Sequence, residues 1–182
     1  MNQAKTLKST ILRPLLLILL CLLGVFPLDV ILPSFPALAE AFQVQPKQIA
    51  YSVSFFAFGV AVAQLVIGPL SDRIGRNRLL LGGLAVSIAG ATGCLLSSDY
   101  ETFMAFRLLQ AAGCGSLVLG QALIQDLYSG KQRNTMRIVI TSASGLFISI
   151  SPIAGAALQQ LFGWEGSFTA FILIATFVIF LT

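Results

Sequence analysis

Histidine is absent from this sequence of 182 residues, and charged residues make up only 10% of it. A soluble domain usually carries about a quarter charged residues, so this chain could not cover a surface that faces water. Histidine is also the side chain most often used as a general base or metal ligand near neutral pH. With no histidine and only seven acidic residues, we expect no catalytic set, no metal site and no cofactor, and therefore no enzyme.

Cysteine is scarce as well. The three cysteines, Cys21, Cys94 and Cys114, are far apart, and each lies in an apolar run. No spacing typical of a metal site or of a disulfide framework occurs. We therefore expect all three to be small buried residues.

Long apolar runs are what the sequence has in abundance, since 57% of its residues are hydrophobic. A membrane-spanning helix needs about 20 mainly apolar residues. Six such spans are predicted, and the short polar links between them make neighbouring spans antiparallel. The predicted spans are 11–32, 49–70, 79–96, 103–124, 136–161 and 164–182. We therefore predict an all-α integral membrane protein, with residues 1–182 forming a single six-helix bundle.

The distribution of basic residues predicts the orientation. Cytoplasmic loops of membrane proteins are enriched in Lys and Arg. With the N-terminus inside, nine of the eleven basic residues lie on the cytoplasmic side. Both ends are then cytoplasmic, and the net charge of +4 reflects membrane topology, so no nucleic-acid partner is expected.

Two ionisable residues, Asp29 and Arg107, lie inside predicted spans. A charge at the centre of a bilayer costs about 3 kcal/mol or more, so such residues usually face a protein interior or a wet cavity. At 1.5 Å per residue the two lie at similar depth, and their opposite signs make them predicted partners. The pair is either a static link between helices or a proton-responsive one. Gln110, one turn from Arg107, and Gln64 extend the predicted polar patch.

Small residues and proline mark the fifth span, where Ser151, Pro152 and Gly155 predict a bend and close helix packing. Aromatic residues gather in the second and sixth spans, namely Phe55, Phe56, Phe58, Phe171, Phe177 and Phe180. These rings either line a pocket of drug size or face lipid, and the sequence leaves both interpretations open.

Three motifs resemble those of a known family. The stretch GPLSDRIGRNRLLLGG, residues 68–83, resembles the signature between spans 2 and 3 of the major facilitator superfamily. RLLQAAG, residues 107–113, is similar to the family's span 4 motif. SPIAGAAL, residues 151–158, resembles the span 5 motif of drug:proton antiporters of the bicyclomycin and chloramphenicol-resistance type. Asn77, Ala111 and Glu165 depart from the family patterns.

The resemblance implies a twelve-helix protein built from two six-helix halves, of which this chain would be the N-terminal half, with the C-terminal half absent. It places Asp29 and Arg107 on the helices that line the central cavity. It also implies a cytoplasmic gating latch between spans 2, 3 and 4 that holds the outward-facing state. The predicted latch residues are Gly68, Asp72, Arg73, Gly75, Arg76 and Asp126.

The function implied is proton-driven efflux of small amphiphilic or antibiotic-like molecules by alternating access, in the bacterial inner membrane. The expected partners are the small-molecule substrate, protons, the lipid bilayer and the missing six-helix half. Alternatives are proton-coupled uptake of a small nutrient, a non-transporting half-transporter scaffold, and a homodimer of six-span halves.

Overall fold

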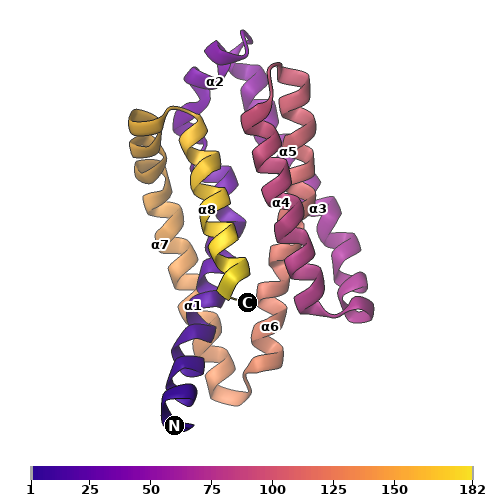
Figure 1. Ribbon diagram of the computed structural model, residues 1–182, viewed down its shortest axis with the longest axis vertical. Helices are drawn as coiled ribbons and strands as arrows, with labels where there is room; N and C mark the ends of the chain where they lie inside the picture. Colours follow the sequence, from indigo (N-terminus) through magenta and orange to yellow (C-terminus); the bar gives the residue numbers. More distant parts are fainter. Residues whose placement is uncertain (1, 182) are drawn as a thin grey trace.

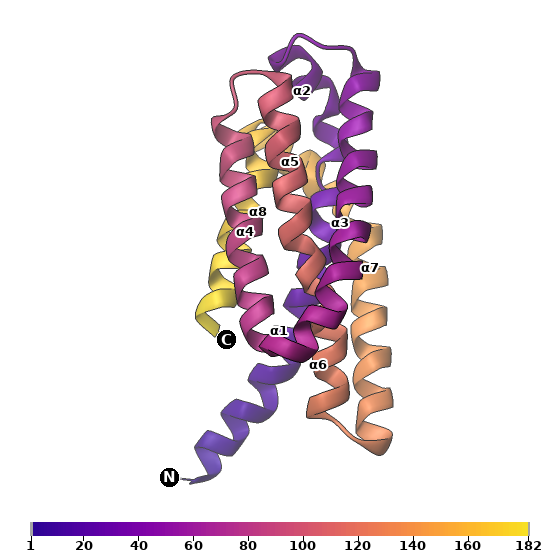
Figure 2. The ribbon, with the colours of Figure 1, turned by 90° about the vertical axis from the view of Figure 1, so that its right-hand side faces the viewer.

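The structure is a computed structural model that describes residues 2–181, with side chains described for residues 13–181. Lys5 and Lys8, which the sequence places on the cytoplasmic side, have side chains outside this described part. All regular structure within residues 2–181 is helical, and the helices stand roughly side by side (Figures 1 and 2). The elements are α1 (Asn2–Asp29), η1 (Leu32–Ser34), α2 (Phe35–Ala41), α3 (Pro46–Ile74), α4 (Arg76–Leu96), α5 (Tyr100–Cys114), η2 (Gly115–Val118), α6 (Leu119–Leu127), α7 (Gly130–Phe162) and α8 (Glu165–Leu181).

The first span is longer and less regular than predicted. Helix α1 ends at Asp29, and the chain continues through the 3-10 turn η1 into α2. Pro33 and Pro36 are the second residues of η1 and α2, where proline fits because an N–H in the first turn of a helix has no partner within the helix. The apolar segment as a whole extends from Arg13 to Ala41.

The fourth span is also interrupted. The sequence predicts one helix over 103–124, whereas the structure has α5, the 3-10 turn η2 and then α6. The Ser116 hydroxyl donates to the Gly113 carbonyl at 2.8 Å, and such local bonds compete with the regular helical pattern. The span therefore carries a turn of tighter helix at its centre.

Helices α4 and α5 pack closely through small residues. A side chain at Gly83 would collide with Ser116, and one at Gly113 would collide with the backbone of Ser87. Gly90 lies against the backbone of Gln110 at the same interface. These glycines let the two backbones approach closely.

Helices α3 and α7 contrast with that pair, because most of their apolar surface is uncovered. Within its apolar window α3 is 6% buried and α7 is 17% buried, against 61% for the span 100–127 that contains α5. Within the described part of the chain, five helical segments, including these two, are long and apolar enough to cross a membrane, and α8 is apolar but shorter, at 17 residues.

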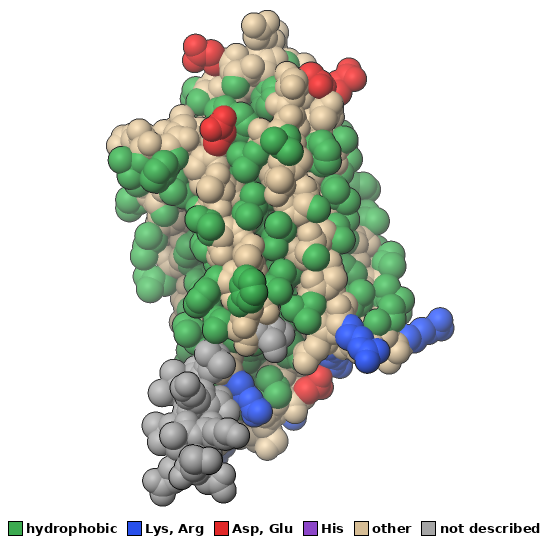
Figure 3. All heavy atoms as spheres, viewed as in Figure 1, with side chains coloured by type: hydrophobic (Ala, Val, Ile, Leu, Met, Phe, Trp, Pro, Cys, Tyr) green, Lys and Arg blue, Asp and Glu red, His purple; other side chains and the backbone are tan. Residues whose placement is uncertain are grey.

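The charges lie at the two ends of the bundle. Figure 3 shows basic side chains at the end where the N-terminus lies and most of the acidic side chains at the opposite end. This separation fits the orientation from the positive-inside rule. The prediction of an all-α integral membrane fold is confirmed.

Candidate functional site

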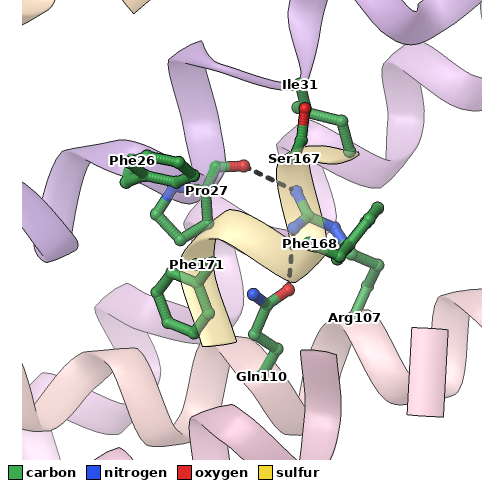
Figure 4. Close-up of a pocket in the computed structure, with 8 residues that line it drawn as sticks. All are labelled: Phe26, Pro27, Ile31, Arg107, Gln110, Ser167, Phe168 and Phe171. Atoms are coloured by element: carbon green, nitrogen blue, oxygen red, sulfur yellow. Dashed lines mark hydrogen bonds between the residues drawn. The ribbon is translucent and has the colours of Figure 1, made fainter. Parts of the chain in front are cut away.

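Arg107 lies at the centre of the bundle on α5, with only 1% of its surface exposed. Its Nη1 donates to Gln110 Oε1 at 2.9 Å, and its Nη2 donates to the Pro27 carbonyl at 3.1 Å (Figure 4). The last carbonyls of a helix have no partner within it, and α1 ends two residues after Pro27. The end of α1 therefore supplies the acceptor that holds the guanidinium.

Two aromatic rings flank the same guanidinium. The Cζ atom of Arg107 lies 4.3 Å from the ring centroid of Phe56 and 5.7 Å from that of Phe168. Both rings are buried, and a cation over an aromatic face gains attraction from the ring quadrupole. Phe56 on α3 and Phe168 on α8 thus bring two further helices to the site.

A small cavity adjoins Arg107, with a volume of about 10 Å³, enough for about one water molecule. Arg107 Nε is buried and has no hydrogen-bond partner among the described residues. The cavity is lined by Phe26, Pro27, Ile31, Arg107, Gln110, Ser167, Phe168 and Phe171 (Figure 4). The aromatic residues Phe56 and Phe171 are buried at this centre, but the described bundle does not itself enclose a pocket of drug size here.

Asp29 does not pair directly with Arg107 in this structure. The ion pairs among the described residues all belong to Arg76, whereas Arg107 bonds to Gln110 and to the Pro27 carbonyl. Asp29 is the half-buried last residue of α1. The depth of a residue, estimated from the sequence, gives its place along the membrane normal but not its direction around the helix axis. The Arg107 guanidinium therefore donates to the Pro27 carbonyl and not to the Asp29 carboxylate.

Gln64 lies outside this site. It is exposed on α3, eight residues beyond Phe56, which is roughly 12 Å further along a helix. The predicted polar patch therefore reduces to Arg107 and Gln110, with Asp29 nearby on the chain that supplies the Pro27 carbonyl.

The stretch of α7 that contains Ser151, Pro152 and Gly155 combines a proline inside the helix with a close contact to the end of α1. Pro152 cannot donate to the Ile148 carbonyl, and the Ser151 hydroxyl donates to that carbonyl instead, at 2.9 Å. Helix α7 consequently continues unbroken through the proline. A side chain at Gly155 would collide with the Val30 carbonyl, so the glycine permits the contact between α7 and the chain just past Asp29.

At the cytoplasmic end, Arg76 links three elements. Its Nη1 lies 2.7 Å from Asp126 Oδ2 and donates to the Ala122 carbonyl at 2.8 Å, both on α6. Its Nη2 lies 3.9 Å from Asp72 Oδ1 at the end of α3. We call Asp72, Arg76 and Asp126 the cytoplasmic charge cluster.

The turn between α3 and α4 depends on Gly75, whose φ angle is +98°, a conformation that glycine adopts at no steric cost. Arg73 is exposed and forms no ion pair within the described residues. At Gly68 nothing lies within 4 Å of where a side chain would begin. Gly68 therefore makes no close helix contact among residues 2–181.

Sequence reasoning did not find the Pro27 carbonyl, Phe168 or Ser167 as parts of the site. The Ser167 hydroxyl donates to the Val30 carbonyl at 3.4 Å, which adds α8 to the contacts around the end of α1. The proline-rich segment after Asp29 was the available signal, because it implies free carbonyls at that helix end.

Comparison with known proteins identifies the family. The model of the Major Facilitator Superfamily matches residues 15–182. The chain belongs to the major facilitator superfamily. Membership and the apolar spans make it a multi-pass protein of the bacterial inner membrane.

Several bacterial members of the superfamily are similar to this chain. A bicyclomycin resistance protein homolog of Haemophilus influenzae is 34% identical over 169 residues, which cover 92% of this chain and 42% of that protein. A chloramphenicol resistance protein of Pseudomonas aeruginosa is 31% identical, over 81% of this chain and 36% of that protein. The multidrug transporter MdfA of Edwardsiella ictaluri is 30% identical, over 90% of this chain and 40% of that protein. The chain thus spans about two fifths of the length of these relatives.

Proposed function

We propose that this chain is the N-terminal six-helix half of a proton-driven multidrug exporter of the inner membrane, working by alternating access. The names of the similar proteins support the substrate class, since they denote bicyclomycin resistance, chloramphenicol resistance and multidrug transport. The observation that carries the mechanism is the buried Arg107, which is bound only to neutral acceptors.

In the proposed mechanism Asp29 carries the proton and Arg107 responds to its charge. While Asp29 is protonated, the guanidinium stays with Gln110 and the Pro27 carbonyl. Loss of the proton creates a negative charge close to the end of α1, and opposite charges attract strongly at low dielectric constant. The guanidinium then leaves the Pro27 carbonyl for the carboxylate, and the contact between α1 and α5 changes with it.

The cytoplasmic charge cluster is the proposed latch. It ties the start of α4 to α6 and to the end of α3, at the end of the bundle that must open for the inward-facing state. Its groups remain partly exposed, with 29% of the Arg76 side chain and 52% of the Asp126 side chain accessible. An exposed ion pair contributes little stability, so this contact can break in each transport cycle.

A second six-helix half is the proposed partner. The uncovered apolar faces of α3 and α7 support this arrangement, because a second unit would bury them and would complete a substrate cavity larger than the one beside Arg107. The substrate then binds between the halves.

The central test is Asp29→Asn in the full-length transporter. In everted membrane vesicles, transport of a labelled antibiotic driven by a pH gradient should be lost, because the neutral amide cannot release a proton. Substrate binding in the absence of a gradient should persist. Glu40→Gln, which neutralises an exposed acid on the opposite side of the bundle from the latch, is the matched control and should transport normally.

Undiminished gradient-driven export by Asp29→Asn would exclude Asp29 as the coupling residue. Counterflow in the same vesicles distinguishes export from nutrient uptake through the labelled compounds that exchange. A scaffold without transport activity would exchange none of them.

A further inference from the structure

A second cavity, much larger than the one at Arg107, opens at the cytoplasmic end of the bundle. It lies between the middle of α1, the end of α6 and the start of α7, and its volume is about 550 Å³. Its lining residues are Arg13, Pro14, Leu127, Tyr128, Lys131, Gln132, Thr135 and Met136. None of them belongs to the Arg107 site or to the cytoplasmic charge cluster.

Arg13 and Lys131 bring two cations to this cavity. Neither Arg13 nor Lys131 forms an ion pair within the described residues. Asp126 is the neighbouring acid on α6, but its carboxylate is engaged by Arg76 at 2.7 Å. The cavity therefore offers net positive charge to an anion.

The geometry of the loop fixes one wall. Arg133 Nε donates to the Tyr128 carbonyl at 2.9 Å, which holds the link between α6 and α7 in place. Gln132 adds an amide donor to the lining. Guanidinium and ammonium groups are the common ligands of phosphate, the former as a planar fork and the latter as a point charge.

The remaining wall is apolar and continues to the outer surface of the bundle. Pro14, Leu127 and Met136 line the cavity, and Leu15 and Leu127 are both 44% exposed. Positive charge beside an exposed apolar wall, at the cytoplasmic level of the spans, matches a molecule with an anionic head and an acyl chain. A free inorganic anion has no apolar part that could contact this wall.

We propose that this cavity binds an anionic phospholipid of the cytoplasmic leaflet, with its phosphate between Arg13 and Lys131. The acyl chain follows Leu127 and Met136 toward the bilayer. Basic pockets between spanning helices on the cytoplasmic side are suited to such headgroups. The assignment does not depend on the transported substrate or on proton coupling.

The test is native mass spectrometry of the full chain, purified in mild detergent and titrated with phosphatidylglycerol or with zwitterionic phosphatidylethanolamine. The double variant Arg13→Gln with Lys131→Gln should reduce binding of phosphatidylglycerol about tenfold, and binding of phosphatidylethanolamine should not change. The matched control, Arg78→Gln with Arg137→Gln, removes two basic residues of the same membrane side that do not line the cavity and should bind like the parent chain.

Equal loss of phosphatidylglycerol in both double variants would overturn the proposal, since binding would then follow net charge alone. Displacement of the lipid by millimolar inorganic phosphate would also overturn it, in favour of a soluble anion. If the double variant does not give helical protein by circular dichroism, the single variants Arg13→Gln and Lys131→Gln decide. Each should bind about threefold more weakly, and parental binding by both would refute the site.

Discussion

Two arginines of the same chain are held in opposite ways. Arg107 is almost fully buried and has only neutral acceptors and aromatic faces around it. Arg76 is partly exposed and meets the carboxylate of Asp126. In the bundle centre the positive charge is left unbalanced, so a new negative charge there has a large effect. At Arg76 the positive charge already has a carboxylate partner and is screened by water, so this pairing is weak and reversible.

The largest loss of stability is expected from Phe56→Leu, which removes the ring whose centroid lies 4.3 Å from the Arg107 guanidinium. Loss of the cation–π contact and of buried volume should together cost about 2 kcal/mol. For a chain of this size that corresponds to a melting temperature lower by about 4–8 °C. Reaction of a thiol dye with the buried Cys94 and Cys114 reports the unfolding.

The control for this variant is Phe58→Leu on the same helix, where the ring is 66% exposed. Its melting temperature should stay near that of the parent protein. Equal shifts for both variants would show that the ring over Arg107 contributes nothing beyond ordinary hydrophobic contact.

A smaller effect is expected from Asp126→Asn at the cytoplasmic end. Removal of this exposed carboxylate should cost less than about 1 kcal/mol of stability, while it weakens the tie between α4 and α6. Spin-label distances across the cytoplasmic end of the full-length transporter should show a larger inward-open population. Asp72→Asn, whose carboxylate is 3.9 Å from Arg76, should give a smaller change in the same direction. An unchanged distribution in both variants would remove the cluster from gating.

The smallest effect concerns Asp99, the N-cap of α5 beyond the membrane-spanning part. Its carboxylate accepts from the Thr102 N–H at 2.8 Å and from the Thr102 hydroxyl at 2.7 Å. These bonds lower the pKa of Asp99, the backbone bond most of all. The stabilisation is therefore present above the unfolded pKa of about 3.9 and is lost as the pH falls through the folded value.

Thermal unfolding of the parent chain and of Asp99→Ala across the acidic range measures this contribution. The two melting curves should differ slightly at neutral pH and converge at low pH. A difference that persists below the folded pKa would assign the stabilisation to something other than the carboxylate.

Hydropathy was sufficient to predict the helical spans, because their length and apolar character follow from the bilayer as solvent, and the distribution of charge predicts their orientation. The breaks inside spans were harder. Pro33 in the sequence indicates that α1 ends shortly before it. The 3-10 turn at Gly115–Val118 depends on the hydrogen bond from Ser116, and no residue in the sequence indicates it as clearly. The tight contact of α4 with α5 depends on Gly83, Gly90 and Gly113.

The candidate site shows where a one-dimensional estimate fails. Arg107 and Gln110 share a helix face, so their contact followed from i, i+3 spacing. To place Asp29 and Gln64 relative to Arg107, one must know how α1 and α3 are rotated about their axes. Helices that are apolar on every side give no sequence pattern from which this rotation can be predicted. Phe56 could not be separated from its exposed neighbours Phe55 and Phe58 for the same reason.

The contact at Gly155 sets a mechanical condition on the molecule. Even a methyl group there would strike the Val30 carbonyl, one residue from the acid at the end of α1 and three from the carbonyl that grips Arg107. An alanine at this position would push α7 away from the end of α1. It would thereby displace the Pro27 carbonyl that binds Arg107, without itself contacting the arginine. A compound that binds between α7 and the end of α1 would inhibit the protein in the same way, without occupying the substrate site.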